Sequence, residues 1–568
     1  MRLNRAVALA TACIVVSTAE LPAQLRPNRN QPTRVNTNPR LLVATPHAFA
    51  AADSAAAVQV GNGMRSRLIG QAERWFNVLT RDQMNEALAQ YAYPIDAVLP
   101  PPVARTLGNA LQARVLVSST MTRDAGGRYT VAARLVGMND DAGHLVVVNQ
   151  LAAQKLEDFG EAVANALLPA FRALPDAKAC MDQSVTAPDK AIGEAQKALK
   201  SQPNHGLASY CLGEIALKKQ NQAEAIANFS AAVTGDSLSL KGWNQLAILY
   251  QLTNDSAKVV STYQQMLRVA PTNQLLREEA FQLFIRYGQP GAARQIAEEG
   301  LEMDPQNADL WDLKSNACLY VEDYKCAIDA LEQVFSNDST KADTTFYQKI
   351  TFATSRGPDT VRFLRWSQTG VRKYPANPFL LEQLLQAYGY AGPIDSVVAV
   401  TRRLVAIDNS DMTPVVRAIQ ALGSAGRVED MVDLGSFIEQ YGNGDDKMNY
   451  AGLLMNAIQS YMSQPDKHQL MVDISRRALA LVPEGNQTWR VANYFLGAAS
   501  WQMFVELDKT IETTKSCEQA QKMAAMLSEI GPAMTAGRTM AEGFATSVLQ
   551  GVEAYRPRVN ALNNAYCK

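Results

Sequence analysis

Four histidines are the first place to look for metal or acid–base chemistry, because imidazole is both a common metal ligand and a proton acceptor near neutral pH. They are His47, His144, His205 and His468. No two of them have the spacing of metal ligands, and the pattern H-E-x-x-H is absent. Only His47 falls at the end of an expected strand, where open α/β sheets often bind ligands. We interpret it as a core-edge or exposed side chain and predict no metal site.

The other motifs that carry chemistry are missing or incomplete. The run Gly61-Asn62-Gly63 lies inside an expected helix and lacks a third glycine, so it is not a dinucleotide-binding loop. Phosphate-binding and nucleophile-elbow motifs do not occur. The acidic pairs Asp140-Asp141 and Asp445-Asp446 lack the calcium-loop pattern and are expected in solvated turns. We therefore predict no catalytic residue and no cofactor; an enzyme whose site shows no motif stays an alternative.

The cysteines suggest disulfides. Without Cys13, which lies in an expected leader, six remain: Cys180, Cys211, Cys318, Cys326, Cys517 and Cys567. Six cysteines allow 15 pairings, so the sequence does not fix the connectivity. Nearest-neighbour pairing is the simplest choice, because Cys318 and Cys326 would flank a helix–helix turn and Cys517 with Cys567 would staple the far end. Six buried free thiols are the alternative. No C-x-x-C occurs, so no thioredoxin-like pair or zinc ribbon is indicated.

Bulk composition limits the class of protein. The chain has 568 residues, too many for one core, so several domains or a solenoid are expected. Charged residues make up 19% and apolar residues 47%, which is typical of a folded chain. The formal net charge of −1 argues against nucleic-acid binding, which needs a clustered basic surface.

The beginning of the chain has the parts of an export signal. Arg2 and Arg5 precede an apolar run over residues 6–19, and Leu21-Pro22-Ala23 offers a small residue for cleavage. We expect residues 1–23 to be a signal peptide, because the run is short for a membrane span of about 20 residues. A lipoprotein cut before Cys13 is the alternative, although the apolar run continues past it. No other segment has the pattern of a transmembrane span, so the mature chain is expected to be exported.

A linker over residues 24–40 follows, rich in proline, asparagine and arginine. Its four arginines are Arg26, Arg29, Arg34 and Arg40, and no acidic residue occurs between Glu20 and Asp53. A solvated linker is one interpretation, and contact with an anionic surface is the other.

A period of 34 residues then runs through the middle of the chain. Trp243 and Trp311 lie two periods apart, and the prolines Pro203, Pro271 and Pro305 fall on the same phase, each closely followed by an asparagine: Asn204, Asn273 and Asn307. Proline cannot continue a helix, and asparagine can cap the next one. Such a period is typical of stacked helical hairpins.

In register, hairpins begin at Gly206, Leu240, Gln274 and Ala308, and a further one fits near Arg172. Small residues recur at positions 8, 20 and 27, large ones at 4, 11 and 24, and proline at 32. This pattern resembles the tetratricopeptide repeat, which implies a helical solenoid that binds protein on its concave face. We expect a regular array over residues 172–341, degenerate hairpins over 342–515 that begin near Pro378, Met412, Gly452 and Arg490, and a helical cap over 516–568.

Residues 41–171 do not follow the period and are expected to form an α/β domain. Strands are expected at 41–44, 75–80, 113–122, 128–136 and 144–150, with helices at 53–69, 81–91, 101–111 and 156–171. This order implies a mixed sheet with helices on its faces. The segments Trp75–Met84 and Ala104–Val117 resemble TolB amino-terminal domains and curli-secretion-type periplasmic domains, which implies protein contacts at the cell envelope.

The concave face of such an array is lined by first helices at about positions 2, 5 and 9. These positions are mostly amides and carboxylates: Tyr210, Glu214, Lys241, Asn244, Glu278, Gln282, Asp309, Asp312, Asn316, Gln348, Glu382 and Gln386. Amides can hydrogen-bond an extended peptide, and carboxylates would favour a basic segment. An ordinary polar helix face is the alternative.

The sequence thus predicts an exported α/β-plus-all-α scaffold that binds a protein or peptide partner, in the periplasm, at the cell envelope or outside the cell. The alternative is binding of an envelope polymer such as peptidoglycan or polysaccharide by the α/β domain and its basic linker.

Overall fold

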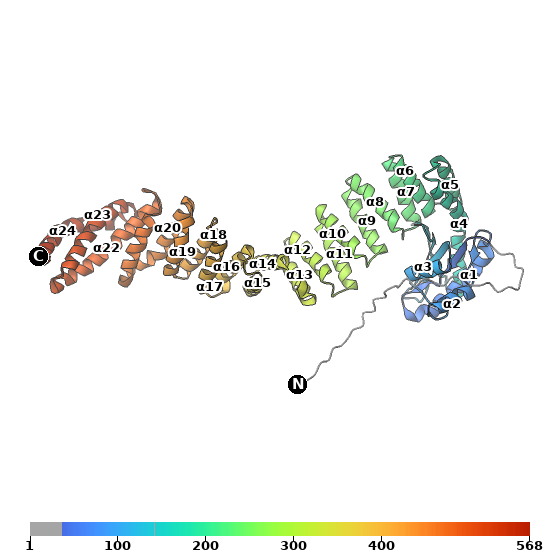
Figure 1. Cartoon of the computed structure of the whole chain (residues 1–568), viewed down its shortest axis with the longest axis horizontal. Coiled ribbons are helices and arrows are strands. Elements are labelled where there is room, and N and C mark those ends of the chain that lie inside the picture. The colour runs from blue at the N-terminus through green and yellow to red at the C-terminus, as the bar shows by residue number, and fades with distance from the viewer. Residues whose placement is uncertain (1–36, 141, 568) are drawn as a thin grey trace, which may run out of the picture. The chain divides into compact units, whose positions relative to one another are not determined.

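A computed structural model describes residues 37–140 and 142–567, which divide into two compact units, residues 1–255 and 256–568. We describe each unit by itself. The expected signal peptide and all but the end of the expected linker lie outside the described residues, as does Asp141. In Figure 1 the described chain continues from the mixed sheet and its helices to successive helical hairpins.

The sheet of the first unit is mixed, as predicted. Its strands are β1 (Arg40–Val43), β2 (His47–Ala48), β3 (Asn77–Val78), β4 (Val115–Arg123), β5 (Tyr129–Gly137) and β6 (His144–Asn149). The order is β3-β1-β4-β5-β6; β3, β1 and β4 are parallel, β5 and β6 are antiparallel, and β2 pairs with the end of β4. Two details correct the expectation: the strand expected at 75–80 is only β3, and His47 belongs to a separate short strand.

Helices cover both faces of this sheet. One face, with Leu41 and Val43, packs against α1 (Ser54–Ala72) and α4 (Leu156–Gln183). The other face, with Leu42 and Ala44, packs against α2 (Arg81–Gln90) and α3 (Pro101–Ala110). Successive strand residues point to opposite faces, so the continuous apolar run of β1 serves two cores.

Glycines let α1 and α4 approach to backbone contact. A Cβ on Gly63 would lie 2.1 Å from the carbonyl oxygen of Glu157, and one on Gly160 would lie 2.1 Å from that of Val60. Real Cβ atoms do not come that close, so both positions require glycine. The Gly61-Asn62-Gly63 run is therefore a helix-packing feature.

The helix α4 corrects the expected end of the α/β domain. We expected a helix over 156–171 and a new hairpin from Arg172, but α4 continues without a break to Gln183 and contains Pro169 and Pro175. Its buried face is continuous from Phe159 to Cys180. The second half of α4 packs against α5 (Pro188–Ser201), so one helix belongs both to the sheet and to the first hairpin. Burial along the whole face outweighs the local cost of the prolines.

The rest of the first unit is α6 (Gly206–Lys218), α7 (Gln222–Gly235) and α8 (Leu240–Leu252). One buried cluster extends from Leu41 in the sheet to Leu249 in α8. The α/β part and the first hairpins therefore share a single hydrophobic core.

The second unit consists of helices arranged as successive hairpins. They are α9 (Ser256–Val269), α10 (Gln274–Arg286), α11 (Pro290–Met303), α12 (Ala308–Tyr320), α13 (Tyr324–Asn337), α14 (Thr344–Ser355), α15 (Thr360–Lys373), α16 (Pro378–Ala391), α17 (Asp395–Ile407), α18 (Thr413–Ser424), α19 (Val428–Tyr441), α20 (Gly444–Ile458), α21 (His468–Leu479), α22 (Gln487–Thr514), α23 (Cys517–Ala536) and α24 (Glu542–Tyr566). Short 3-10 turns also occur, among them η2 (Ser339–Lys341). The expected helical cap is α23 and α24.

The predicted repeat register is confirmed at its four strict starts, since α6, α8, α10 and α12 begin at the expected residues. Asn273, Asn307 and Asn377 cap the next first helix, each accepting a hydrogen bond from a backbone N–H. Asn204 does not act as a cap; it has a φ of 58°, and His205 caps α6 by accepting from the N–H of Ala208 at 3.4 Å.

Two of the later starts are confirmed: α16 begins at Pro378, and Met412 is the N-cap of α18. The expected start at Arg490 lies in the first turn of α22. The start expected near Gly452 is wrong, because Gly452 lies within α20. Asn443 begins that helix with a reciprocal capping box to Asp446, so the second acidic pair lies in a first helical turn rather than in a solvated turn.

Disulfides join the cysteines as nearest neighbours. The pairs are Cys180–Cys211, Cys318–Cys326 and Cys517–Cys567. The first links α4 to α6, the second closes the turn between α12 and α13, and the third joins the start of α23 to the end of the described chain. The alternative of six free thiols is not what the structure has.

Candidate functional site

The expected groove residues of the first unit are not free to bind. Tyr210 is buried and packs edge-to-face against Phe229, with ring centroids 5.3 Å apart, so it is a packing residue. Glu214 accepts a hydrogen bond from the Gln245 amide at 3.1 Å. Lys241 and Asn244 are exposed on α8, and a further interaction occupies Lys241.

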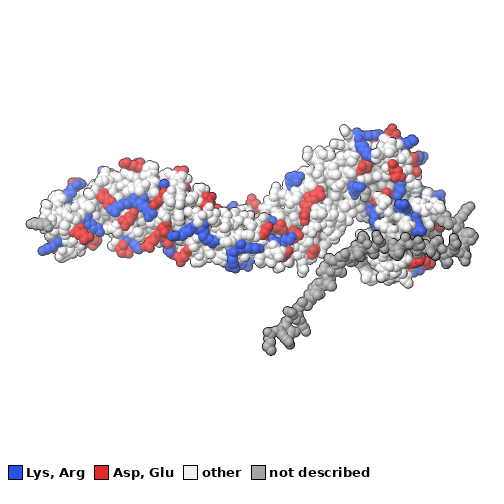
Figure 2. Space-filling view, viewed as in Figure 1, with Lys and Arg blue, Asp and Glu red and all other residues white. Residues whose placement is uncertain are grey.

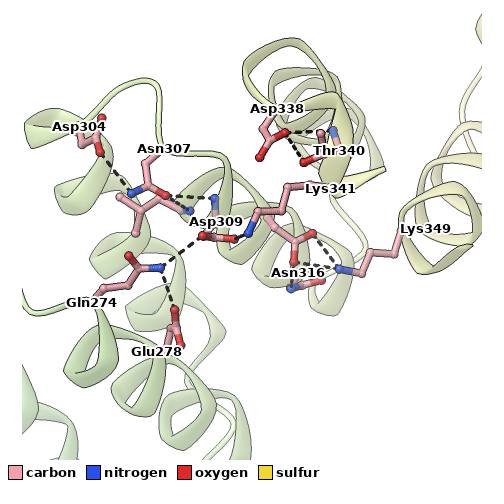
Figure 3. A network of polar contacts seen from close by, with 12 residues as sticks. Gln274, Glu278, Asp304, Asn307, Asp309, Asn316, Asp338, Thr340, Lys341 and Lys349 are labelled. Carbon is pink, nitrogen blue, oxygen red and sulfur yellow. Dashed lines mark hydrogen bonds and ion pairs between the residues drawn. The ribbon is translucent and has the colours of Figure 1, made fainter. Parts of the chain in front are cut away.

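On α10 and α12 of the second unit, the acidic residues expected to line the groove are held by the chain's own side chains (Figure 3). Asp309 on α12 accepts from Lys341 Nζ at 2.6 Å and from the Gln274 amide at 3.4 Å. The same amide donates to Glu278 at 2.9 Å. The hydrogen bond that Lys341 donates to Asp309 raises the pKa of Lys341, so this lysine stays charged. The Asp309 carboxylate is thus neutralised from within.

Asp312 repeats this arrangement one turn further along α12. Lys349 from α14 donates to both carboxylate oxygens, at 2.8 and 3.1 Å, and Asn316 donates to one of them at 3.1 Å (Figure 3). A cavity of about 240 Å³ lies beside these groups. Because each carboxylate already has a lysine, the expectation that they select a basic segment loses its electrostatic basis.

Charges on the second helices are also paired between neighbouring hairpins. Arg365 on α15 reaches Glu332 on α13 at 2.6 Å, and Arg427 reaches Asp395 on α17 at 2.8 Å. On the face seen in Figure 2, positive and negative residues interleave along the hairpins. These pairs hold successive hairpins together, and the face they occupy carries no field of a single sign.

A larger hollow lies elsewhere, between four first helices. A groove of about 1110 Å³ is lined by α14, α16, α18 and α20, with one residue from α19. The helices pack in that order, α14 on α16, α16 on α18 and α18 on α20. Of the expected site residues, Glu382 and Gln386 line this groove. Gln348 is half-buried on α14 and Gln282 is exposed on α10; neither lines it.

The groove combines apolar floor and polar walls. Its apolar residues include Phe352, Phe379, Leu385, Ile419 and Leu453. Its polar residues include Arg356, Glu382, Gln383, Gln386, Arg417, Gln420 and Asn456. This mixture is typical of surfaces that bury an apolar anchor and orient a polar backbone.

The charged and amide side chains of this groove have no hydrogen-bond or ion-pair partners within the part of the chain that the structure describes, whereas the hydroxyls of Ser355 and Ser424 donate to backbone carbonyls of their own helices. Arg356 and Arg417 are exposed and pair with no described carboxylate; Arg356 lies over the Phe352 ring at 5.3 Å. Glu382 has no described cation. The Gln383 Oε1 atom is buried and accepts no hydrogen bond from the described residues. The contrast with Asp309 and Asp312 separates a structural network from a candidate binding surface.

Sequence reasoning missed Arg356, Arg417, Gln420 and Asn456. The signal was present in the register: counting from Thr413, the fifth residue is Arg417, the same position that gave Glu382 in α16. Counted from the helix starts, Arg356 and Asn456 both stand at position 13, which is the C-cap of α14 and a residue within α20. The degenerate part of the array hid the pattern.

The histidines form no metal centre with any other group: within residues 37–140 and 142–567, no three His, Cys, Asp or Glu side chains are placed to hold a metal ion. The structure brings together His144 and His205, which the sequence kept apart. Both are buried, and their rings stack with centroids 5.5 Å apart. Burial lowers the pKa of both, that of His205 to about 3 with His144 as a second cause. They are neutral packing groups at neutral pH.

A buried ion pair lies beside these rings. Asp236, which is 0% exposed, accepts from Arg134 Nε at 2.9 Å, from Arg134 Nη2 at 2.8 Å and from the Gly143 N–H at 2.7 Å. Leu207 N–H donates to Gly143 O at 3.0 Å. These contacts join the β5–β6 end of the sheet to α6 and α7. They stabilise the junction and leave no exposed group for a ligand.

Comparison with known proteins finds distant likenesses among solved structures. No family model and no curated protein matches the chain. Among solved structures, Naa15/Naa10 bound to HypK is 16% identical with a TM-score of 0.37, covering 69% of this chain and 68% of that chain. The carboxyl-terminal part of a TPR repeat-containing protein from Cytophaga hutchinsonii is 11% identical with a TM-score of 0.27, covering 49% and 97%.

Pseudomonas aeruginosa PilF is 12% identical, with a TM-score of 0.20 and coverage of 37% of this chain and 95% of that chain. These likenesses concern helical repeats, and we take no function from them. The chain's own geometry defines its class: a small mixed-sheet α/β domain followed by tetratricopeptide-type helical hairpins and a helical cap. No helix within the described residues is long and apolar enough to span a bilayer.

Proposed function

We propose that this chain is a scaffold that binds a segment of another protein in the groove between α14, α16, α18 and α20. The observation that supports the proposal is the groove itself, about 1110 Å³ in volume and lined by charged and amide side chains without hydrogen-bond or ion-pair partners among the described residues. Buried or half-buried polar groups normally find hydrogen-bond partners. A bound segment supplies them.

An extended polypeptide suits these side chains. Gln383, Gln386, Gln420 and Asn456 carry amides, each able to donate to a peptide carbonyl and to accept from a peptide N–H. The apolar residues of the floor give pockets for alternate side chains of the segment, and burying one such side chain contributes about 1.5–3 kcal/mol. Recognition of this kind forms and breaks no covalent bond.

We further propose that the protein works outside the cytoplasm. Three disulfides are typical of oxidising compartments. The expected signal peptide and the resemblance of the α/β part to TolB-type and curli-secretion-type periplasmic domains rest on the sequence and point the same way. The periplasm or cell envelope is the compartment that suits all of these features.

A photocrosslinking experiment tests the binding site in cells. Benzoylphenylalanine replaces Gln386, and adducts are identified by mass spectrometry. The blocking variant is Gly389→Trp, because Gly389 lines the groove and a Cβ there meets nothing within 4 Å, so bulk fills the groove and not the core. The matched control is Gly291→Trp on α11, where a Cβ also meets nothing within 4 Å. We expect an adduct with one segment of one partner. Gly389→Trp should abolish this adduct, and Gly291→Trp should not change it. An adduct that survives Gly389→Trp, or no adduct at all, overturns the proposal.

A further inference from the structure

The charges in the groove indicate what kind of segment it takes. Arg356 comes from α14, Glu382 from α16 and Arg417 from α18, in the order in which these helices pack. None of the three forms an ion pair with a described residue. Elsewhere in the same unit, exposed arginines such as Arg365 and Arg427 are paired across hairpins. The groove is thus a place where two guanidinium groups remain available for a carboxylate.

We propose that the bound segment carries acidic side chains, read by Arg356 and Arg417. This inference rests on the proposed function and specifies its partner. Guanidinium groups bind carboxylates through paired, charge-assisted hydrogen bonds, which are stronger than neutral ones. The acidic side chains are internal to the segment, because four successive helices line the groove and the segment extends over both arginines.

The spacing of the acidic residues follows from helix packing. Neighbouring helices pack about 8–10 Å apart, so α14 and α18, with α16 between them, are separated by roughly 16–20 Å. Counted from the helix starts, Arg356 stands eight positions later than Arg417, which adds about 12 Å along the helix axis and separates the two arginines by roughly 20–23 Å. An extended chain rises about 3.3 Å per residue, which gives roughly six to seven residues between the two carboxylates. Between them, Glu382 on α16 suits a basic side chain or a backbone N–H.

The buried oxygen of Gln383 supports an extended backbone at this point. Its Oε1 atom is buried without a donor among the described residues, and Gln383 itself lines the groove on α16. A rotation of this side chain toward the groove brings the oxygen within reach of an N–H of the bound segment. The carboxylates then give specificity, while the backbone contact and the apolar floor give affinity.

The test uses a phage-displayed library of random 16-residue peptides, selected on the full chain. Display blocks the carboxyl terminus of each peptide, so only side-chain carboxylates are offered. Selected sequences are synthesised with acetylated and amidated ends, and binding is measured by fluorescence anisotropy. We expect enrichment of Asp or Glu pairs about six to seven residues apart.

Matched variants assign the recognition to residues. Arg356→Gln and Arg417→Gln should each weaken binding roughly tenfold, and replacing the peptide carboxylates by amides should remove the difference between variant and wild type. Arg372→Gln, an exposed arginine on α15 that does not line the groove, should leave binding unchanged.

Two failures are distinguishable. In the first, peptides bind and Gly389→Trp abolishes their binding, but they show no acidic enrichment and no response to Arg356→Gln or Arg417→Gln. This result overturns the acidic partner, while the groove stands as the binding site. A selection with no peptide sensitive to Gly389→Trp overturns both proposals.

Discussion

Replacing Asp236 by Asn should weaken the first unit strongly, because this carboxylate is fully buried and accepts hydrogen bonds from two nitrogens of the Arg134 guanidinium. The side chain of Arg134 is 16% exposed and that of Asp236 is 0% exposed. Removing one member of a buried ion pair typically costs about 3–5 kcal/mol. The substitution also weakens the hydrogen bond from the Gly143 N–H at 2.7 Å.

Urea unfolding of the full chain measures this loss. With an m-value of about 2.5 kcal/mol per molar urea, a loss of 3–5 kcal/mol lowers the midpoint of the affected transition by roughly 1–2 M. Hydrogen exchange read by mass spectrometry assigns the transition to β6 and α6. The control is Asp189→Asn on α5, whose pair with Lys219 at 3.7 Å is exposed and is worth at most about 1 kcal/mol.

Equal midpoints for the two variants would refute the argument. They would mean that the sheet and the first hairpins do not depend on this ion pair, and that the junction is held by apolar packing alone.

Three further predictions concern the same unit. Gly63→Ala should lower the free energy of unfolding by about 1–3 kcal/mol, because the added methyl group overpacks the contact between α1 and α4. Gly70→Ala, on the same helix with nothing within 4 Å of the added Cβ, should raise it by up to about 1 kcal/mol. Equal melting temperatures of the two variants would contradict this prediction. The pKa of His205 is about 3 in the folded chain and about 6.5 in the unfolded chain, so between these values the unfolded chain binds one more proton. The free energy of unfolding should therefore fall as pH drops from 6.5 toward 3, by at most about 1.4 kcal/mol per pH unit. His205→Asn, which can still cap, should reduce that slope in urea titrations at pH 7 and 4.5; an unchanged slope would assign it to other groups. Replacing Cys180 and Cys211 by alanine should lower the free energy of unfolding by about 3–4 kcal/mol, because the disulfide closes a loop of about 30 residues. Urea unfolding under oxidising conditions measures the loss, and no change would show that the bond is not formed in solution.

The sequence predicted the parts of the fold that depend on local pattern. The helix starts at Gly206, Leu240, Gln274 and Ala308 follow from a repeat in which proline ends one hairpin and a polar residue caps the next. The mixed sheet follows from the alternation of apolar runs and turns. The end of α4 did not follow, because the repeat period places a new hairpin near Arg172, while burial of the whole face continues the helix to Gln183.

Long-range pairing explains what the sequence left out of the site. The carboxylates of Asp309 and Asp312 stand at the expected positions, but their partners Lys341 and Lys349 lie 32 and 37 residues further along the chain. Whether a charge is free depends on such partners, and a positional rule does not contain them. For the same reason the available groups of the groove, such as Arg417, emerge only when the helices are stacked.

The most direct test of the account is a charge exchange between Arg417 and its ligand. Binding is measured for the wild type and for Arg417→Glu, each with an acidic peptide from the selection and with its Lys-substituted counterpart. The account predicts that each single change weakens binding roughly tenfold and that the double exchange restores most of the loss. Losses that simply multiply, with no restoration, would contradict recognition of an acidic segment in this groove.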